Sequence, residues 1–335
     1  MARDTLAILG MIRKARVLSV GDLMLDVYIH GEAARLSPEA PVPIVRVARR
    51  LLMPGGMGNV VMNLRALGAK PMALGLLGQD DSGRRLRKLL MPGKSQGDMA
   101  LVVDKGRPTT VKTRVIAGIQ QVVRYDEESL LPASPLVCAR VKKEAKRLLS
   151  TAKSLSLSDY GKGLLDEKLT QWFVRAAKAH DIPVLVDPKG PDWRPYAGAT
   201  LVTPNRQELS MALGRDLTHA SSKDLAKGAS ELIERHGIRN ILVTRSEDGM
   251  SLVSQGGKSW HLPTRARAVF DVSGAGDTVV AAMAAALAAG ATLREGAMLA
   301  TLAAGVVVGK VGTSTASPEE IMESLAIERA EREGS

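Results

Sequence analysis

A glycine-rich segment near the C-terminus is the strongest chemical pattern in this 335-residue chain. Residues 271–278 read Asp-Val-Ser-Gly-Ala-Gly-Asp-Thr, and an apolar run follows directly. Small residues let the backbone approach an anion closely, and the start of a helix directs free N–H groups at it. The amides of Gly274, Ala275 and Gly276 could therefore hold a transferring phosphoryl group, while Asp277 accepts the proton of an attacking hydroxyl. The alternative is an ordinary helix start with Asp277 as a favourable first-turn carboxylate.

Two common phosphate-binding signatures are incomplete in this chain. A Walker loop needs a glycine upstream of Gly-Lys-Ser/Thr, and the two Gly-Lys-Ser triplets have Lys88 and Leu252 at that place. The dinucleotide fingerprint needs a third glycine after Gly-x-Gly, and its two partial matches have Val61 and Val279 there. The sequence therefore disfavours a Walker-type loop and a dehydrogenase.

Polar side chains follow a series of expected strands at the points where those strands end. The carboxyl ends of parallel strands share one edge of an open sheet, where ligands bind. Several carboxylates and lysines converging there suit a chemistry of phosphates and metal ions. For any single residue, the alternative is that Asp, Asn and Gly only punctuate turns. The residues concerned are Asp22, Asp26, Asp159, Lys162, Asp187, Lys189, Asn205, Glu208, Thr244, Arg245, Ser246 and Glu247.

The elements that must position these residues alternate between strands and helices after Pro132. This alternation predicts an α/β fold with a central, mostly parallel sheet and helices on both faces. Two extended segments, approximately 28–47 and 111–125, have the prolines or the hairpin pattern of a small β lid. Strands are predicted at 17–20, 154–157, 183–186, 200–202 and 240–243, and helices at 140–149, 165–180 and 223–236.

Composition limits the class of protein further. The chain carries 46 Lys and Arg against 35 Asp and Glu, and the resulting charge of +11 favours anionic partners. Aromatic residues make up only 3% of the chain, which disfavours the base-stacking platforms of a single-strand nucleic-acid binder. Apolar runs at 279–291 and 297–309 are shorter than the roughly 18 residues that span a bilayer, and they predict buried helices. Cys138 is alone, so we expect a reducing compartment, the cytoplasm.

The glycine-rich segment resembles the C-terminal signature of the ribokinase-like, or PfkB, carbohydrate kinase family. Pro-Gly-Gly-Met-Gly-Asn at 54–59 resembles the N-terminal signature of the same family. Further segments resemble one branch of the family, the bacterial kinases of D-glycero-β-D-manno-heptose 7-phosphate. The similarity runs from about residue 16 to residue 318. These further segments are 20–26, 35–43, 157–163, 186–190 and 309–314.

The resemblance implies a role for each matching residue. Asp277 would be the catalytic base for the anomeric C1 hydroxyl, with the amides of Gly274, Ala275 and Gly276 as the anion hole. Asn205 and Glu208 match an Asn-x-x-Glu element that organises Mg²⁺ and the ATP phosphates, through waters. Residues implied to hold sugar hydroxyls are Asp26, Gly55, Gly56 and Asn59. Residues implied to contact ATP are Asn205, Glu208, Thr244, Ser246, Gly249, Gly274 and Gly276.

A sugar phosphate also needs cations at the far end of its pocket, because an unpaired dianion is costly to desolvate. Lys162, Lys189 and Arg124 are the candidates, and Lys189 comes first because it follows the end of a strand. The alternative for each is an ordinary surface cation.

Taken with the resemblance, the sequence predicts one kinase domain over residues 1–335, with the lid at 28–47 and 111–125 and an acidic helix or tail at 318–335. The expected reaction is ATP- and Mg²⁺-dependent phosphorylation of D-glycero-β-D-manno-heptose 7-phosphate at C1. Its product, the 1,7-bisphosphate, belongs to ADP-heptose and lipopolysaccharide inner-core biosynthesis. A requirement for a monovalent cation stays open. We expect a homodimer formed through the lid, with no nucleic-acid or membrane partner.

Two alternatives remain from the sequence. The chain could be a PfkB kinase for another sugar, sugar phosphate or nucleoside, or a basic nucleic-acid-binding or regulatory protein on a kinase scaffold. Relatives of the heptose branch often carry a fused nucleotidyltransferase domain with a Gly-His-x-Gly-His motif. That motif does not occur here, so we expect the stand-alone kinase.

Overall fold

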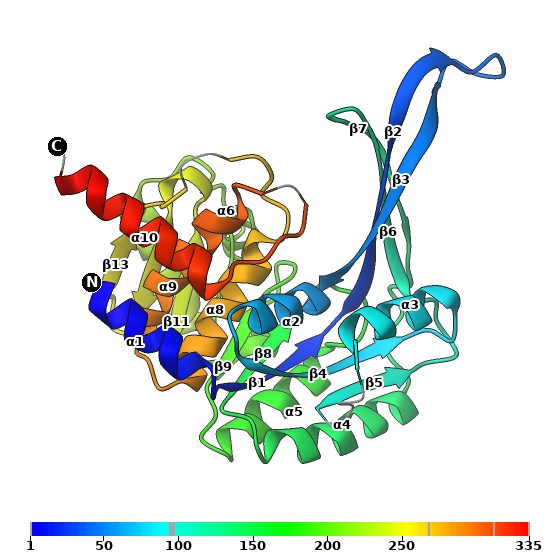
Figure 1. Ribbon diagram of the computed structural model, residues 1–335. Coiled ribbons are helices and arrows are strands. Elements are labelled where there is room, and N and C mark those ends of the chain that lie inside the picture. Colours follow the sequence, from blue (N-terminus) through cyan, green and yellow to red (C-terminus); the bar gives the residue numbers. More distant parts are fainter. Residues whose placement is uncertain (1, 94–97, 267–268, 311, 334–335) are drawn as a thin grey trace.

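The computed structural model describes residues 2–93, 98–266, 269–310 and 312–333, and a large sheet forms its framework (Figure 1). Nine strands of the described chain form this sheet in the order β13-β12-β11-β10-β9-β8-β1-β4-β5. Every pair of neighbours from β11 to β5 is parallel. β12 runs antiparallel to both of its neighbours, β11 and β13. The predicted mostly parallel sheet is confirmed. Its strands are β1 (Arg16–Gly21), β4 (Lys70–Leu77), β5 (Met99–Val103), β8 (Ser154–Ser158), β9 (Val184–Asp187), β10 (Leu201–Val202), β11 (Asn240–Thr244), β12 (Met250–Ser254) and β13 (Ser259–Leu262).

Helices cover both faces of this sheet, as predicted, because successive strand residues point to opposite faces. Val17 and Leu185 pack into a cluster with α1, α2, α8, α9 and α10. Their neighbours Leu18 and Val184 pack with α4, α5, α6 and α7 on the other face. The helices are α1 (Ala2–Ile12), α2 (Met57–Ala66), α3 (Asp81–Leu90), α4 (Pro135–Leu149), α5 (Glu167–Lys178), α6 (Arg206–Leu213), α7 (Ser222–His236), α8 (Ala275–Ala288), α9 (Leu293–Val307) and α10 (Pro318–Glu333).

A second, four-stranded sheet projects from the body of the molecule (Figure 1). Its order is β3-β2-β6-β7, and we call it the projecting sheet. The predicted segments 28–47 and 111–125 lie in it, but the first ribbon extends further at both ends. Its inner ends are buried, since Leu23 and Leu25 pack against α2 and α3. The strands are β2 (Leu23–Leu36), β3 (Pro43–Gly56), β6 (Thr110–Ala117) and β7 (Gln120–Glu127).

The terminal helices pack on the body beside α8 and α9 (Figure 1). In α1, the apolar run near the N-terminus buries Ile8, Leu9 and Ile12. At the other end, α10 contains the acidic segment predicted from residue 318, of which residues 334–335 lie outside the described chain. In the described residues, no helix combines the length and apolar character that crossing a membrane requires.

Candidate active site

Asp277 lies in the first turn of α8, where the glycine-rich segment ends. Gly274 precedes the helix with a φ of 79°, a left-handed conformation that side chains other than glycine rarely adopt. A Cβ at this position would lie 2.5 Å from Asn59 Nδ2. Glycine therefore lets the start of α8 approach α2 closely, and this approach brings Asp277 and Asn59 together.

The carboxylate of Asp277 is buried and accepts two hydrogen bonds. Asn59 Nδ2 donates to Oδ2 at 2.9 Å, and the Tyr160 hydroxyl donates to Oδ1 at 2.7 Å. Burial raises the pKa of Asp277 to about 6, and the two hydrogen bonds oppose that rise. At neutral pH the group is mostly ionised and has lone pairs left to accept a proton, as a general base requires.

One of the amides expected to form the anion hole already has a hydrogen-bond acceptor within the protein. The first amides of a helix have no acceptor within the helix, which leaves the N–H of Gly276 directed out of the helix end. By contrast, the N–H of Ala275 donates to the carbonyl of Val272 at 3.2 Å. Of the predicted amides, that of Ala275 is therefore already engaged in this structure.

The predicted sugar-binding residues lie next to Asp277. Asp26 on β2 accepts a hydrogen bond of 2.6 Å from Arg114 Nη1, and burial raises its pKa. The negative charge of Asp26 also contributes to the raised pKa of Asp277. A Cβ on Gly55 would lie 2.1 Å from Asp26 Oδ2, and Gly56 turns the chain into α2 with a φ of 55°.

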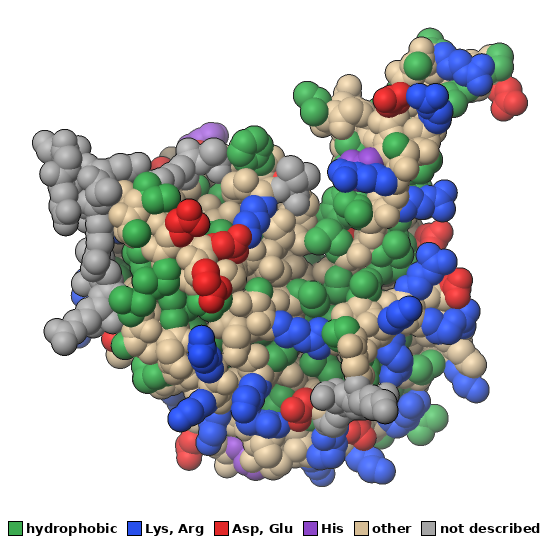
Figure 2. Space-filling view, in the orientation of Figure 1, with side chains coloured by type: hydrophobic (Ala, Val, Ile, Leu, Met, Phe, Trp, Pro, Cys, Tyr) green, Lys and Arg blue, Asp and Glu red, His purple; other side chains and the backbone are tan. Residues whose placement is uncertain are grey.

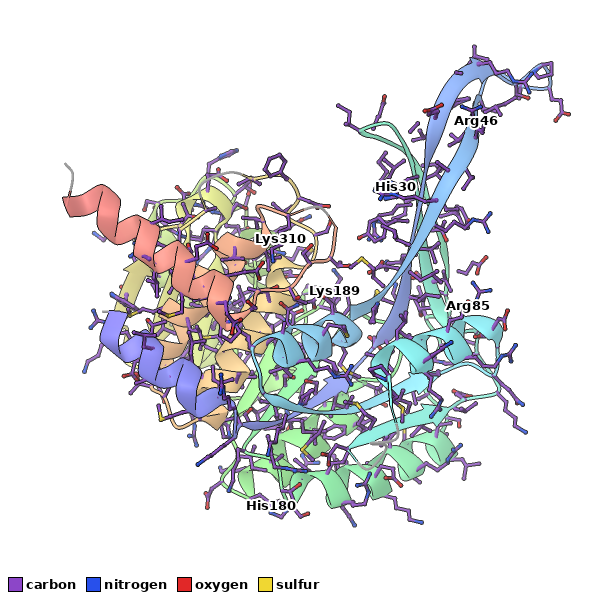
Figure 3. All side chains as sticks on the ribbon, viewed as in Figure 1. His30, Arg46, Arg85, His180, Lys189 and Lys310 are labelled. Atoms are coloured by element: carbon purple, nitrogen blue, oxygen red, sulfur yellow. The ribbon has the colours of Figure 1, made fainter. Side chains whose placement is uncertain are left out.

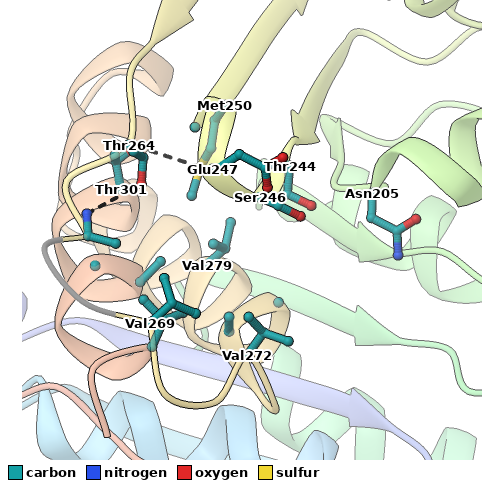
Figure 4. Close-up of a pocket in the computed structure, with 17 residues that line it drawn as sticks. Asn205, Thr244, Ser246, Glu247, Met250, Thr264, Val269, Val272, Val279 and Thr301 are labelled. Atoms are coloured by element: carbon teal, nitrogen blue, oxygen red, sulfur yellow. Dashed lines mark hydrogen bonds between the residues drawn. The ribbon is translucent and has the colours of Figure 1, made fainter. Parts of the chain in front are cut away.

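A cavity of about 380 Å³ opens beside the start of α8 (Figure 4). Most of the residues predicted to contact ATP line it, including Gly276 at the helix start. Thr301 and an apolar wall complete the lining, and only the structure reveals that wall because its members come from separate loops and helices. The predicted residues are Asn205, Thr244, Ser246, Gly249 and Gly276, and the apolar wall includes Val269, Val272, Val279 and Val308.

Asn205 and Glu208 form a capping box at the start of α6. Asn205 Oδ1 accepts the N–H of Glu208 at 2.8 Å, and Glu208 Oε2 accepts the N–H of Asn205 at 3.0 Å. Each side chain keeps polar atoms that could bind a ligand, but one of its oxygens already accepts a hydrogen bond that caps the helix. This structural role is one that the sequence analysis did not assign.

The acidic residues around this helix start suit a divalent cation. Burial raises the pKa of Glu208, and it raises that of Asp187 well above the ordinary value, helped by the charges of Asp277 and Glu208. A divalent cation would relieve this repulsion, and Mg²⁺ prefers oxygen ligands. No group of three or more His, Cys, Asp or Glu in the described ranges could enclose a metal ion. Asn205, Glu208 and Asp187 are the residues here that could hold Mg²⁺.

The three candidate cations for the sugar phosphate lie in different surroundings. Lys162 Nζ forms an ion pair of 2.8 Å with Glu128. Lys189 lines a pocket together with Asp159 and Gly161, and it is labelled in Figure 3. Its charge lowers the pKa values of Asp159, Asp187 and Glu208.

Arg124 belongs to the face of the projecting sheet that carries Asp26. Arg124 lies directly across from Arg114 on the neighbouring strand. Arg114 donates a hydrogen bond to Asp26, and its guanidinium lies over the ring of Tyr28. Arg124 Nε also contacts Asp126 at 3.1 Å. Lysine and arginine side chains gather along the projecting sheet, and His30 points from it toward the body (Figures 2 and 3).

Comparison with solved structures defines the class of protein. Phosphofructokinase-2 from Escherichia coli superposes with a TM-score of 0.77 at 22% identity, covering 94% of this chain and 98% of that one. Ribokinase from Arabidopsis thaliana, solved with ribose and ATP, gives 0.74 at 20% identity, covering 93% and 99%. These likenesses show the ribokinase-like fold that the sequence predicted.

The model of the pfkB family of carbohydrate kinases matches residues 14–320, and the chain belongs to that family. It is therefore a phosphotransferase that acts on a sugar hydroxyl. Among curated relatives, the bifunctional protein HldE of Paramagnetospirillum magneticum is 49% identical over 94% of this chain, and that of Acidiphilium cryptum is 45% identical over 96%. The chain spans only 64% and 65% of the lengths of these two relatives.

Proposed function

We propose that this kinase transfers the γ-phosphoryl group of ATP to the C1 hydroxyl of D-glycero-β-D-manno-heptose 7-phosphate. The observation that carries the reaction is the buried carboxylate of Asp277, which Asn59 holds at the start of α8 beside the cavity that Gly276 lines. The choice of sugar is supported by the segments that resemble heptose 7-phosphate kinases and by the similarity to HldE proteins. The product is the 1,7-bisphosphate, on the route to ADP-heptose and the lipopolysaccharide inner core.

In this mechanism Asp26 and Asn59 orient the sugar, and Asp277 accepts the proton of its C1 hydroxyl. The sugar oxygen forms a bond to the γ-phosphorus, the bond to the β–γ bridging oxygen breaks, and ADP leaves. Amides at the start of α8, with Gly276 foremost, stabilise charge on the transferring group. Mg²⁺ held near Glu208 would neutralise phosphate charge. A cytoplasmic location is part of the proposal, because ATP is the donor.

An ADP-release assay tests the substrate. We expect turnover with heptose 7-phosphate to exceed clearly that with fructose 6-phosphate or ribose. A preference for either of those sugars would replace the heptose assignment with another acceptor of the same family. Absence of sugar-dependent ATP consumption, together with tight and strongly salt-dependent nucleic-acid binding, would instead indicate a binding protein on a kinase scaffold.

Alanine variants of the three candidate cations test which of them binds the 7-phosphate of the sugar. Because Arg124 shares a sheet face with Asp26, we expect Arg124→Ala to weaken binding of heptose 7-phosphate by about 10-fold or more while sparing unphosphorylated heptose. Lys162 is likewise ion-paired, with Glu128, but it lies in the loop after β8 and not on the sheet face of Asp26. Lys162→Ala therefore serves as the control, with a small effect expected on both sugars. For Lys189→Ala, selective loss of the phosphorylated sugar would place the phosphate at Lys189, whereas a raised KM for ATP would place Lys189 with the nucleotide.

We also propose that two copies pair through the projecting sheet. Its strands and turns expose large apolar side chains, which is unusual for a surface without a partner. Light scattering should give about twice the chain mass of 35.6 kDa, and Val123→Lys should shift the protein toward the monomer. A wild-type mass of one chain would contradict the pairing. The exposed residues of this sheet and its turns are Leu36, Val42, Val47, Leu51, Ile119, Val123 and Tyr125.

A further inference from the structure

Tyr160 contacts the candidate base directly, although it stands 117 positions away in the sequence. Its hydroxyl donates to Asp277 Oδ1 at 2.7 Å. Burial, followed by the charge of Asp277, raises the pKa of Tyr160 well above its ordinary value, so the phenol keeps its proton and remains a donor. The sequence placed Tyr160 in a motif but assigned it no role.

The loop that carries Tyr160 is fixed by a second buried carboxylate. Asp22, at the end of β1, accepts the backbone N–H groups of Tyr160 and Lys162 through Oδ2, each at 3.0 Å. Its Oδ1 accepts the N–H of Leu164 at 3.4 Å. Asp22 is only 4% exposed, so water competes little for these bonds. This set of contacts holds the loop against the end of the strand and aims the Tyr160 hydroxyl at Asp277.

We propose that Tyr160 is a positioning residue that sets both the orientation and the basicity of Asp277. Asn59 donates to Oδ2 and Tyr160 to Oδ1, so the two donors hold the carboxylate plane from both sides. Each carboxylate oxygen has two lone pairs, so each keeps capacity to accept a hydrogen bond from a sugar hydroxyl. Asp22 acts through the loop and is the anchor of the arrangement.

Loss of the Tyr160 hydroxyl should raise the pKa of Asp277. Burial raises the pKa of Asp277, and the bond from Tyr160 opposes that rise. In Tyr160→Phe this opposition is gone, so the pKa of Asp277 rises and more of the base is protonated at a given pH. We expect the acid limb of the kcat/KM profile, near pH 6 in the wild type, to move upward by about 1 pH unit. We expect kcat at its plateau to fall roughly 10-fold to 10²-fold, because the carboxylate is less well oriented.

Tyr196→Phe is a matched control. The Tyr196 hydroxyl is also in the interior and also donates to a carboxylate, Asp159 Oδ2 at 2.8 Å, but it does not contact Asp277. This variant should leave the acid limb in place. Because the phosphate of the substrate can itself titrate near pH 6, the comparison uses the difference between variants with the same substrate.

The proposal rests on Asp277 acting as the base, so Asp277→Asn is measured alongside with the best acceptor sugar. An inactive Asp277→Asn together with an unshifted acid limb in Tyr160→Phe overturns the positioning role and leaves the proposed function intact. An active Asp277→Asn overturns the base assignment itself. Thermal unfolding checks that Tyr160→Phe is folded, and Tyr160→Met, which also lacks the hydroxyl but adapts to the space, should give the same upward shift.

Discussion

Replacing Asp277 by asparagine is expected to lower kcat by roughly 10²-fold to 10⁴-fold, the usual contribution of a positioned general base. The amide keeps the size of the side chain but cannot accept the proton of the sugar hydroxyl. Its oxygen can still accept from Asn59, and its Nδ2 can donate to the Tyr160 oxygen, so the surrounding contacts persist. Steady-state kinetics with saturating ATP and sugar measure the loss.

The same variant should be at least as stable as the wild type. The pKa of Asp277 is raised from 3.8 to about 6, so the folded state binds more protons than the unfolded state between these values. Stability from this group is therefore full below pH 3.8 and is lost as pH rises through 6. At pH 8 the buried charge costs about 3 kcal/mol at 1.36 kcal/mol per pKa unit, and asparagine removes that cost.

Thermal unfolding at pH 8 and a titration with ATP provide the controls. We expect a Tm equal to or above that of the wild type, and unchanged affinity for ATP. A large fall in Tm would mean that the kinetic loss reports misfolding. Turnover within a few-fold of the wild type would contradict the assignment of Asp277 as the base.

The sequence predicted those site residues that belong to short, continuous patterns. The glycine-rich start of α8 is such a pattern, and the residues predicted around Thr244 and Asn205 line one cavity as expected from parallel strand ends. Physical rules at the level of a few residues are enough for these features, because glycine, helix starts and strand ends impose local geometry.

Contacts between distant segments could not be predicted in the same way. The bond from Tyr160 to Asp277 and that from Arg114 to Asp26 depend on how loops and the projecting sheet meet the body. Nothing in the spacing of either pair indicates the contact. The capping box of Asn205 and Glu208 does follow from local sequence, since Asn-x-x-Glu before a helix is the pattern of such a box.

Some of the charged residues behind the net charge of +11 can be located in the candidate site. In the body, burial and the charges of Asp277 and Glu208 raise the pKa of Asp187. On the projecting sheet, Arg114 and Arg124 lie directly across from each other. An anionic group would favour the paired arginines, and a cation would favour the carboxylates around Asp187.

A single methyl group at Gly276 tests whether phosphate docks at the start of α8. A Cβ at Gly276 would meet nothing within 4 Å, and the residue lines the nucleotide cavity. Gly276→Ala should therefore fold normally and gain up to about 1 kcal/mol from the better helix former. The methyl group would occupy space that a phosphate needs to reach the amide, so we expect kcat/KM for ATP to fall about 10²-fold.

Alanine variants at two other glycines distinguish obstructed phosphate binding from a change in stability as the cause of lost activity. Gly10 in α1 also has open space around it, so Gly10→Ala should give a similar gain in stability with no kinetic effect. At Gly274, the φ of 79° and the 2.5 Å approach to Asn59 make alanine destabilising, so Gly274→Ala should lower both Tm and activity. Only Gly276→Ala should lower activity while stability is kept. If its kcat/KM for ATP equals that of the wild type, the transferring phosphate does not bind at this helix start, because a methyl group there would obstruct it.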